Sequence, residues 1–316
     1  IKGTATPTES SCFIKVNPDG SITLLSSTVE IGAGEKTVLA QIAAETIGVT
    51  IESISIPNPD TATTPFDAGV TSSRTTYHMG NAVRLAGQEA RRKILELAGE
   101  ILKTQTSRLR LSRSTIFEEG VGERLTLKEL LSKKFGGRGG TLLAEGRFSP
   151  AGSPLLAASE GREAMSSIFW AFATHAVEVE VDTQTGTVKV LKIAAAHDVG
   201  KAINPLGCEQ QIEGAAIMGL SNTLFEEFKM EKGRVLNDTL ADYKVATIKD
   251  LPEIVPIIVE TGDPEGPFGA KGVGEAAASC PAPAIANAVF DAVGIWMKDL
   301  PITPEKILAA LKEQNK

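Results

Sequence analysis

The sequence predicts an α+β fold built from two lobes of similar plan. Twice along the chain, two strand-like segments around a turn are followed by a loop and then by a helical pattern, first over residues 12–48 and again over residues 176–228. Helices and hairpins are mixed throughout, without the strict strand–helix alternation of a doubly wound sheet. A chain of 316 residues with 42% hydrophobic content can bury a large core, and its length suits two domains. We therefore expect one lobe over residues 1–150 and another over residues 151–316, each with a hairpin or mixed sheet and packed helices.

The first lobe begins with a predicted hairpin. Residues 12–29, CFIKVNPDGSITLLSSTV, place apolar runs on both sides of an Asn-Pro-Asp-Gly turn. Residues 36–48, KTVLAQIAAETIG, carry apolar side chains at helical spacing, and Gly48 is expected to end that helix. Two more helices are expected over residues 80–102 and 125–135, and a linker rich in Gly, Ser and Pro over residues 136–154.

The second lobe repeats this order. Valines alternate through residues 176–197 on either side of Asp182–Gly186, which predicts a second hairpin. The helix after it is expected to have Asn204 as its N-cap and Pro205 at its first position. Two further helices are expected over residues 281–294 and from residue 303 onwards.

Composition excludes several classes of function. The net charge is −7 and Lys and Arg do not cluster, so no nucleic-acid partner is expected. No run of 18 apolar residues occurs and the N-terminus has no signal-peptide core, so no membrane span is expected. Cys12, Cys208 and Cys280 are far apart and form no CxxC pair, which favours the reducing cytoplasm and argues against zinc or iron–sulfur ligation by this chain.

Two loops rich in small residues precede the predicted helices of the first lobe. In Glu30–Gly34, EIGAG, the backbone of Gly32 and Ala33 could bind an anion at a helix N-terminus, or simply form a tight turn. In the stretch VTSSRTTY, Ser and Thr hydroxyls surround a single arginine and could converge on a phosphate or a heterocycle, or form a solvated cap. The candidate residues there are Ser72, Ser73, Arg74 and Thr75.

The second lobe supplies two more candidate stretches. Gln211, Gly214 and Met218 share one helix face, and each glycine inside a helix costs roughly 1 kcal/mol relative to alanine, so a close helix or ligand is expected there. In residues 266–275, GPFGAKGVGE, glycines remove side chains around Glu275. A carboxylate with cleared surroundings suits a general base that acts on something bulky, although Lys271 and Glu275 could also be a surface pair.

His197 and Asp198 are adjacent in the sequence. Neighbouring residues of an extended chain point to opposite faces, so we do not expect a catalytic dyad. Asp198 and Asn204 are instead expected to anchor the loop between them.

In this order, the four stretches resemble the C-terminal half of the molybdopterin-binding subunit of the xanthine oxidase family of molybdenum hydroxylases, over nearly the whole chain. VEIGAGEKTVLAQIAAETIGV is similar to the family's E-M-G-Q-G segment and its helix, and SSRTTYHMGNAVRLA to its cofactor loop. HAVEVEVDTQTGTVKVLKIAAAHDVGKAINP is similar to its second hairpin, and QQIEGAAIMGL to G-Q-I-E-G-x-x-x-Q-G. GPFGAKGVGE followed by PAIANAVFDAVG is the most specific match.

The resemblance implies the fold of the family's second molybdenum-binding domain and a molybdenum pyranopterin cofactor, in its mono- or dinucleotide form. Glu275 would be the catalytic base beside the metal, with no protein side chain bound to molybdenum itself. The implied reaction is hydroxylation of an N-heterocycle or aldehyde with water as the oxygen source. The implied cofactor contacts are Gly32, Ala33, Ser72, Ser73, Arg74, Thr75, Gln211, Gly272, Val273 and Gly274.

Two departures and several missing parts qualify these expectations. Ala33 and Met218 stand where the family usually has glutamine, which leaves open a non-catalytic binding or assembly module of the same fold. The family's G-G-x-F-G-x-K stretch, the cysteines of its [2Fe–2S] clusters and its flavin domain do not occur in this sequence. The resemblance therefore implies half of an active site, whose partners would be the other half of the molybdenum subunit, a [2Fe–2S] subunit and an FAD subunit. Such a split is similar to that of nicotinate dehydrogenase.

Overall fold

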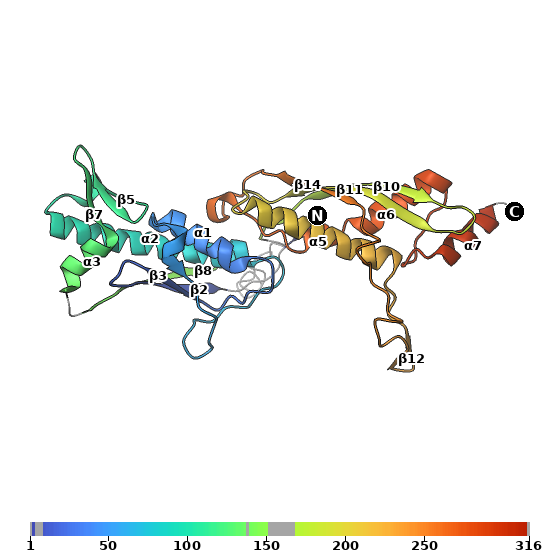
Figure 1. Cartoon of the computed structure of the whole chain (residues 1–316), viewed down its shortest axis with the longest axis horizontal. Helices are drawn as coiled ribbons and strands as arrows, with labels where there is room; N and C mark the ends of the chain where they lie inside the picture. The colour runs from blue at the N-terminus through green and yellow to red at the C-terminus, as the bar shows by residue number, and fades with distance from the viewer. Residues whose placement is uncertain (1, 4–8, 137–138, 151–167, 315–316) are drawn as a thin grey trace, which may run out of the picture. The chain divides into compact units, whose positions relative to one another are not determined.

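The computed structural model describes residues 2–3, 9–136, 139–150 and 168–314 (Figure 1). The chain forms two compact units, which we call the N-terminal unit (Gly3–Trp170 with Gly262–Gly272) and the C-terminal unit (Ile1–Lys2, Ala171–Thr261 and Val273–Lys316). Both contain helices and sheets, as predicted. The division differs from the expected lobes in that residues 262–272 return to the N-terminal unit.

A four-stranded sheet forms the centre of the N-terminal unit, in the order β4-β3-β2-β8. The predicted hairpin is confirmed, because β2 (Ser10–Val16) and β3 (Ile22–Ser26) pair antiparallel from Cys12↔Ser26 to Val16↔Ile22. The short β4 (Ile54–Ser55) pairs with β3 in parallel and follows the 3₁₀-helix η1 (Ile51–Ser53). Alternate side chains of the hairpin are fully buried, as period-2 alternation requires; they are Cys12, Ile14, Val16, Ile22 and Leu24.

The fourth strand corrects the linker prediction. β8 (Leu142–Phe148) lies within residues 136–154 and pairs antiparallel with the whole of β2. A side chain at Gly146 would overlap the carbonyl oxygen of Ala82, so this glycine lets a helix approach the sheet closely. Residues 137–138 and 151–154 of the expected linker lie outside the described residues.

Helices α1 (Glu35–Ile47) and α2 (Thr75–Leu102) lie against this sheet (Figure 1). Gly48 ends α1 in the left-handed conformation, as predicted, and α2 begins five residues earlier than expected. α3 (Leu127–Phe135) starts with a capping box between Thr126 and Glu129. A second sheet follows η2 (Thr106–Arg108) and contains β5 (Leu109–Ser112), β6 (Thr115–Glu118) and β7 (Gly122–Thr126).

The C-terminal unit is built on the second predicted hairpin, which is also confirmed. β10 (Ala173–Val181) pairs antiparallel with β11 (Val188–Asp198), and β14 (Glu253–Val259) pairs parallel to β11. α5 (Pro205–Leu224), α6 (Pro281–Val293) and α7 (Pro304–Gln314) match the predicted helices and their caps. The core of this unit includes Ile193, Ile212, Ile285 and Val289. The remaining strands have two residues each: β1 (Lys2–Gly3), β9 (Trp170–Ala171), β12 (Met230–Glu231) and β13 (Arg234–Val235).

One stretch of the described chain, Ala276–Val293, is long and apolar enough to cross a membrane by length and composition alone, with a mean hydropathy of 1.2. It is not an uninterrupted apolar run, because it contains Asn287 and Asp291. The stretch is divided between η5 (Ala276–Ala278) and α6, and Ile285 and Val289 on α6 are fully buried in the core of the unit. Core helices commonly have this composition.

Candidate functional site

The glycine-rich segment before Glu275 is seated on the N-terminal half of α2. Asn81 of α2 is fully buried and donates its Nδ2 hydrogens to the carbonyl oxygens of Glu265, at 2.8 Å, and Tyr77, at 3.0 Å. A side chain at Gly80 would approach Cγ of Pro267 within 2.9 Å, so α2 and η4 (Pro267–Gly269) pack closely. Residues far apart in the sequence thus meet at the start of α2.

Two predicted cofactor stretches meet at Gly272. A side chain there would overlap the carbonyl oxygen of Ser73, so only glycine allows this contact. Ser72 and Ser73 have φ angles of 51° and 55°, in the left-handed region that serine rarely adopts. Such residues cost about 1–3 kcal/mol each and cluster at ligand sites. The glycine therefore clears space for the strained Ser72–Ser73 turn.

The N-terminus of α2 fits an anionic cofactor. This helix has 28 residues, its N-cap Arg74 makes no side-chain cap, and its first turn contains no acidic residue. The first N–H groups of a helix have no intrahelical acceptor, and the helix dipole favours negative charge beside them. Thr75, at the first helical position, and the adjacent Ser72–Ser73 turn are therefore suited to the phosphate or pterin oxygens of a molybdopterin.

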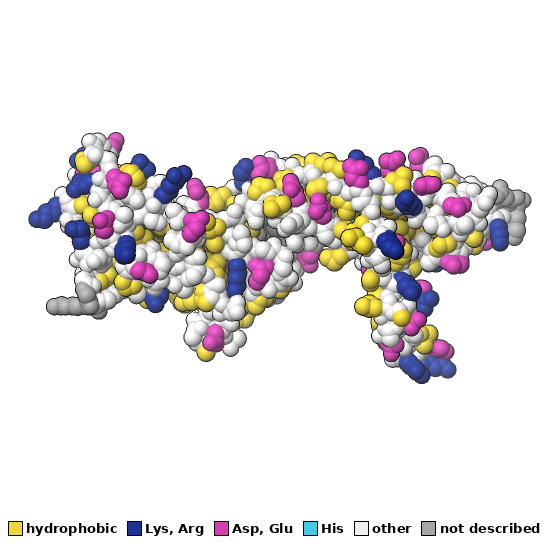
Figure 2. All heavy atoms as spheres, in the orientation of Figure 1, with side chains coloured by type: hydrophobic (Ala, Val, Ile, Leu, Met, Phe, Trp, Pro, Cys, Tyr) yellow, Lys and Arg dark blue, Asp and Glu magenta, His cyan; other side chains and the backbone are white. Residues whose placement is uncertain are grey.

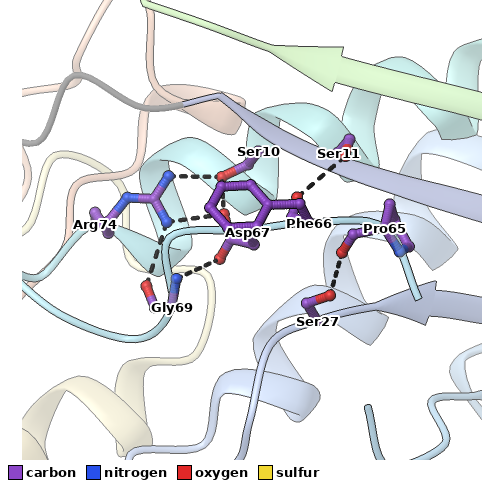
Figure 3. Close-up of polar contacts among 8 residues, drawn as sticks. All are labelled: Ser10, Ser11, Ser27, Pro65, Phe66, Asp67, Gly69 and Arg74. Carbon is purple, nitrogen blue, oxygen red and sulfur yellow. Dashed lines mark hydrogen bonds and ion pairs between the residues drawn. The ribbon is translucent and has the colours of Figure 1, made fainter. Parts of the chain in front are cut away.

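The side chain of Arg74 turns inward instead of towards a ligand (Figure 3). It is fully buried, and its Nη1 donates to Oδ1 of Asp67 at 2.9 Å and to the carbonyl oxygen of Gly69 at 3.2 Å. Its Nη2 donates to Oγ of Ser10 at 2.8 Å, and this hydroxyl donates to Asp67 at 2.6 Å. The guanidinium therefore ties the loop before α2 to strand β2.

In the EIGAG loop, the carboxylate of Glu30 accepts the backbone hydrogen bonds that an anionic ligand could accept. Glu30 accepts hydrogen bonds from the backbone N–H groups of Gly32 and Gly34 at 3.0 Å and of Lys36 at 3.1 Å. Gly32 has a φ angle of 100°, which favours glycine, and nothing lies within 4 Å of the place where its side chain would be. The N–H of Gly32 is thus bonded within the protein, while Ala33 beside it is half-buried.

The carboxyl groups of Glu30 and Glu35 shift each other's pKa in opposite directions in this loop. The hydrogen bond from Glu35 and those from the backbone lower the pKa of Glu30 to about 2. Burial, together with the neighbouring Glu30, raises the pKa of Glu35 to about 7. Glu35 is 7% exposed, so an uncharged carboxylic acid is favoured there. The pair carries a single negative charge at the start of α1.

The remaining candidates belong to the C-terminal unit. Gln211, Gly214 and Met218 lie on one face of α5, as predicted; Gln211 is half-buried and the other two are exposed. A side chain at Gly214 would meet nothing within 4 Å, whereas one at Gly219 would approach the carbonyl oxygen of Ala278 within 2.6 Å. Packing therefore explains Gly219, while the face around Gly214 is open.

Glu275 is exposed and occupies the N-cap position of η5. Val273 and Gly274 before it are half-buried. The chain passes from the N-terminal to the C-terminal unit between Gly272 and Val273, so the predicted base follows directly on the contact with Ser73.

Sequence reasoning missed one feature of the C-terminal unit, a pair of histidines on adjacent strands. The Nε2 atoms of His175 and His197 lie 2.7 Å apart, and burial lowers the pKa of each to about 4. One neutral ring therefore donates to the other. Asp198 accepts from the N–H of Gly200 and from Oγ1 of Thr261, so it anchors the loop as expected. The only signal in the sequence was that a hairpin would bring both residues onto adjacent strands. In the observed register His197 lies opposite Ala173 and His175 lies opposite Ala195, so the two histidines are diagonal neighbours.

Comparison with known proteins identifies the family. The sequence model of the molybdopterin cofactor-binding domain matches residues 1–252. The chain is 34% identical to a putative xanthine dehydrogenase molybdenum-binding subunit of Escherichia coli K12, over 92% of this chain and 38% of that protein. It is 31% identical to subunit gamma of the 6-hydroxypseudooxynicotine dehydrogenase complex of Paenarthrobacter nicotinovorans, over 96% of this chain and 38% of that protein.

Solved structures agree with this assignment. Quinoline 2-oxidoreductase from Pseudomonas putida 86 superposes with a TM-score of 0.84 and 28% identity, over 99% of this chain and 40% of that chain. The chain thus spans less than half the length of these relatives. It belongs to the molybdopterin cofactor-binding domain family, as part of the molybdenum-binding subunits of xanthine dehydrogenases and related oxidoreductases.

Proposed function

We propose that this chain is the molybdopterin-binding half of a molybdenum hydroxylase and that Glu275 is its general base. The observation that carries the proposal is the contact between Gly272 and the strained Ser72–Ser73 turn, three residues before an exposed carboxylate. It links the loop at the uncapped start of α2 to the stretch that ends in Glu275. The proposed substrate is an N-heterocycle or an aldehyde, because the names of similar proteins include both xanthine dehydrogenase and quinoline 2-oxidoreductase and an aldehyde oxidoreductase.

Each element has a defined task in this proposal. The first turn of α2 and Ser72–Thr75 bind the anionic part of the cofactor through backbone N–H groups and hydroxyls, and Gln211 and residues 272–274 complete the contacts. When bound, the molybdenum cofactor supplies the two-electron redox centre and a Lewis acid. Glu275 removes the proton from the water-derived oxygen that is transferred to the substrate. A carboxylate is a strong enough base because the Lewis acid makes this proton acidic.

The same proposal includes partners, because the chain spans 38% of the length of its curated relatives. The other half of the molybdenum subunit would complete the active site. A [2Fe–2S] subunit and an FAD subunit would remove the electrons, since no cluster-binding cysteine pattern occurs in this sequence. One relative, from Paenarthrobacter nicotinovorans, is itself a subunit of a dehydrogenase complex.

The substitution Glu275→Gln in the assembled enzyme tests the base. We expect molybdenum content to be retained and kcat to fall by about 10²–10⁴-fold, the usual contribution of a general base. Glu180→Gln, at an exposed position of β10 in the same unit, is the matched control and is expected to leave kcat unchanged. Turnover close to wild type in the Glu275→Gln enzyme would contradict the assignment, and loss of molybdenum would show that Glu275 holds the cofactor instead.

The alternative is a non-catalytic binding or assembly module. Ala33 and the exposed Met218 favour it, because neither can hydrogen-bond a pterin through its side chain. Metal analysis of the native complex distinguishes the two. Stoichiometric molybdopterin supports the enzyme, and a metal-free complex supports the module.

A further inference from the structure

Residues 226–251 form an extended excursion from the C-terminal unit, which we call the arm. It leaves the end of α5 and returns at β14, and its only regular structure is the pair of two-residue strands β12 and β13 (Figure 1). It contributes none of the fully buried residues of the core of its unit.

Large apolar side chains project from the arm into solvent. Among the described residues, 23 large hydrophobic side chains are exposed, and seven of them lie in these 26 residues (Figure 2). Ile248 is 87% exposed and Leu240 is 77% exposed. Single exposed apolar residues are normal, but a group of this size on one segment marks an interaction surface. The others are Phe228, Met230, Leu236, Val245 and Leu251.

Polar contacts give the arm a defined shape. Asn237 is buried; its Nδ2 donates to the carbonyl oxygen of Glu227 at 2.6 Å, and its Oδ1 accepts from the N–H of Lys229 at 3.0 Å. Tyr243 donates its hydroxyl to Glu226 at 2.7 Å. Oγ of Ser221 on α5 accepts from the N–H of Ala246 at 3.0 Å. These few polar contacts hold the arm, while its large apolar side chains and most of its charged side chains are exposed.

The charges of the arm select the kind of partner. Six acidic side chains alternate with five basic ones along residues 226–251, so the arm has almost no net charge. An anionic lipid surface or a nucleic acid would need a basic face. A mixed-charge segment with exposed apolar anchors instead matches a protein interface with an apolar centre and a polar rim.

We propose that the arm docks onto the part of the molybdenum-binding subunit that this chain does not include; this rests on the function proposed above. The curated relatives are longer than the region matched here, which is 38% of their length. The superposition on quinoline 2-oxidoreductase covers 99% of this chain and 40% of that one. Because 99% of this chain is superposed, the 26 residues of the arm are included in the match. The longer quinoline 2-oxidoreductase chain therefore contains an equivalent segment. The part of the subunit outside the matched region is therefore the occupant that we propose.

Hydrogen exchange of the arm tests the docking. Amides of residues 228–251 are compared in chain 1–316 expressed by itself and in the complex purified from the native host, whose second component is identified by its G-G-x-F-G-x-K stretch. We expect at least tenfold slower exchange in the complex. Equal exchange in the two samples would overturn the proposal. So would protection in the isolated chain that accompanies a dimeric mass, because the occupant would then be a second copy, or binding of the isolated chain to phospholipid vesicles.

A double variant, Leu240→Asp with Ile248→Asp, adds a test that does not depend on exchange. Both side chains are almost fully exposed, so the isolated variant is expected to keep the melting temperature of the wild type. Recovery of the complex should fall at least tenfold, whereas Val121→Asp, an exposed position on the N-terminal unit, should leave recovery unchanged. Undiminished recovery of the double variant would overturn the docking. Molybdenum is assayed separately, so a metal-free complex with a protected arm would contradict the enzymatic function and leave the docking intact.

Discussion

At the scale of single residues, the chain uses its own charged groups to build the loops that family resemblance assigns to the cofactor. Arg74 and Asp67 form a buried ion pair, and Glu30 accepts the N–H groups at the start of α1. Removing one partner of a buried pair is strongly destabilising, so such pairs fix loop geometry. The sequence alone did not show that the side chain of Arg74 points into the protein. The one hint was Asp67, an acidic residue seven positions earlier with which Arg74 forms its ion pair. The sequence predicted that glycines clear the surroundings of Glu275, whereas at Gly272 the structure shows the carbonyl oxygen of Ser73 in the place of a side chain.

The pKa of Glu35 leads to a pH-dependent prediction. Its folded pKa of about 7 exceeds the ordinary value of 4.5, so between these pH values the unfolded chain loses the proton first. The free energy of unfolding should therefore fall as pH rises from about 4.5 to 7 and then level off. The lowered pKa of Glu30 acts only below this window, where stability is lost as pH falls from 4.5 towards 2.

Glu35→Gln removes this titration while keeping an uncharged side chain of the same size. Between pH 5 and pH 8 the wild type should lose free energy of unfolding through this titration, and the variant should not. The difference between variant and wild type should therefore grow by on the order of 1 kcal/mol from pH 5 to pH 8. Urea denaturation at the two pH values measures the gain. Glu45→Gln, at an exposed position of the same helix, is the control and should show no such change. If Glu35→Gln changed the free energy of unfolding equally at both pH values, the raised pKa of Glu35 would be refuted.

At the scale of elements, local signals predicted most helices and both hairpins. The Asn-Pro-Asp-Gly turn, Gly48, Asn204 and Gly294 act through backbone conformation or capping, which neighbouring residues determine. β8 was missed because its partner, β2, lies more than 120 residues away and its own alternation is weak. The same reason explains why the return of residues 262–272 to α2 could not be predicted, since it depends on tertiary contacts such as Asn81 to Glu265.

Two of the three glycines of α5, Gly214 and Gly219, give a matched pair of predictions for this helix. Gly214→Ala should raise the free energy of unfolding by about 1 kcal/mol, because the side chain enters open space and alanine favours the helix. Gly219→Ala should lower it by about 1–3 kcal/mol, because its side chain would crowd Ala278 and Pro281. Thermal unfolding monitored by circular dichroism measures both. Stabilisation by both substitutions would show that the packing around Gly219 is not as described.

At the scale of the whole molecule, the residues that we propose for the site are distributed over two units, and the chain passes between these units several times. Ser72–Thr75 and Gly272 belong to the N-terminal unit, and Gln211 and Glu275 to the C-terminal unit. The two-lobe plan followed from the repeated hairpin–loop–helix order, because each lobe needs its own hydrophobic core. The sequence did not predict that the chain passes from one unit to the other directly after Gly272, because nothing in the local sequence distinguishes the glycines of GAKGVGE from one another.

Separate cores predict separate unfolding. Leu24 is fully buried in the N-terminal unit and Ile285 is fully buried in the C-terminal unit. Each substitution to alanine should cost about 2–4 kcal/mol, because it removes buried methyl groups and leaves a cavity. In scanning calorimetry we expect two transitions, with Leu24→Ala lowering the midpoint of one and Ile285→Ala that of the other. A single transition whose midpoint is lowered equally by both variants would mean that the two units unfold together. Assembly with the rest of the subunit would then stabilise both units at once.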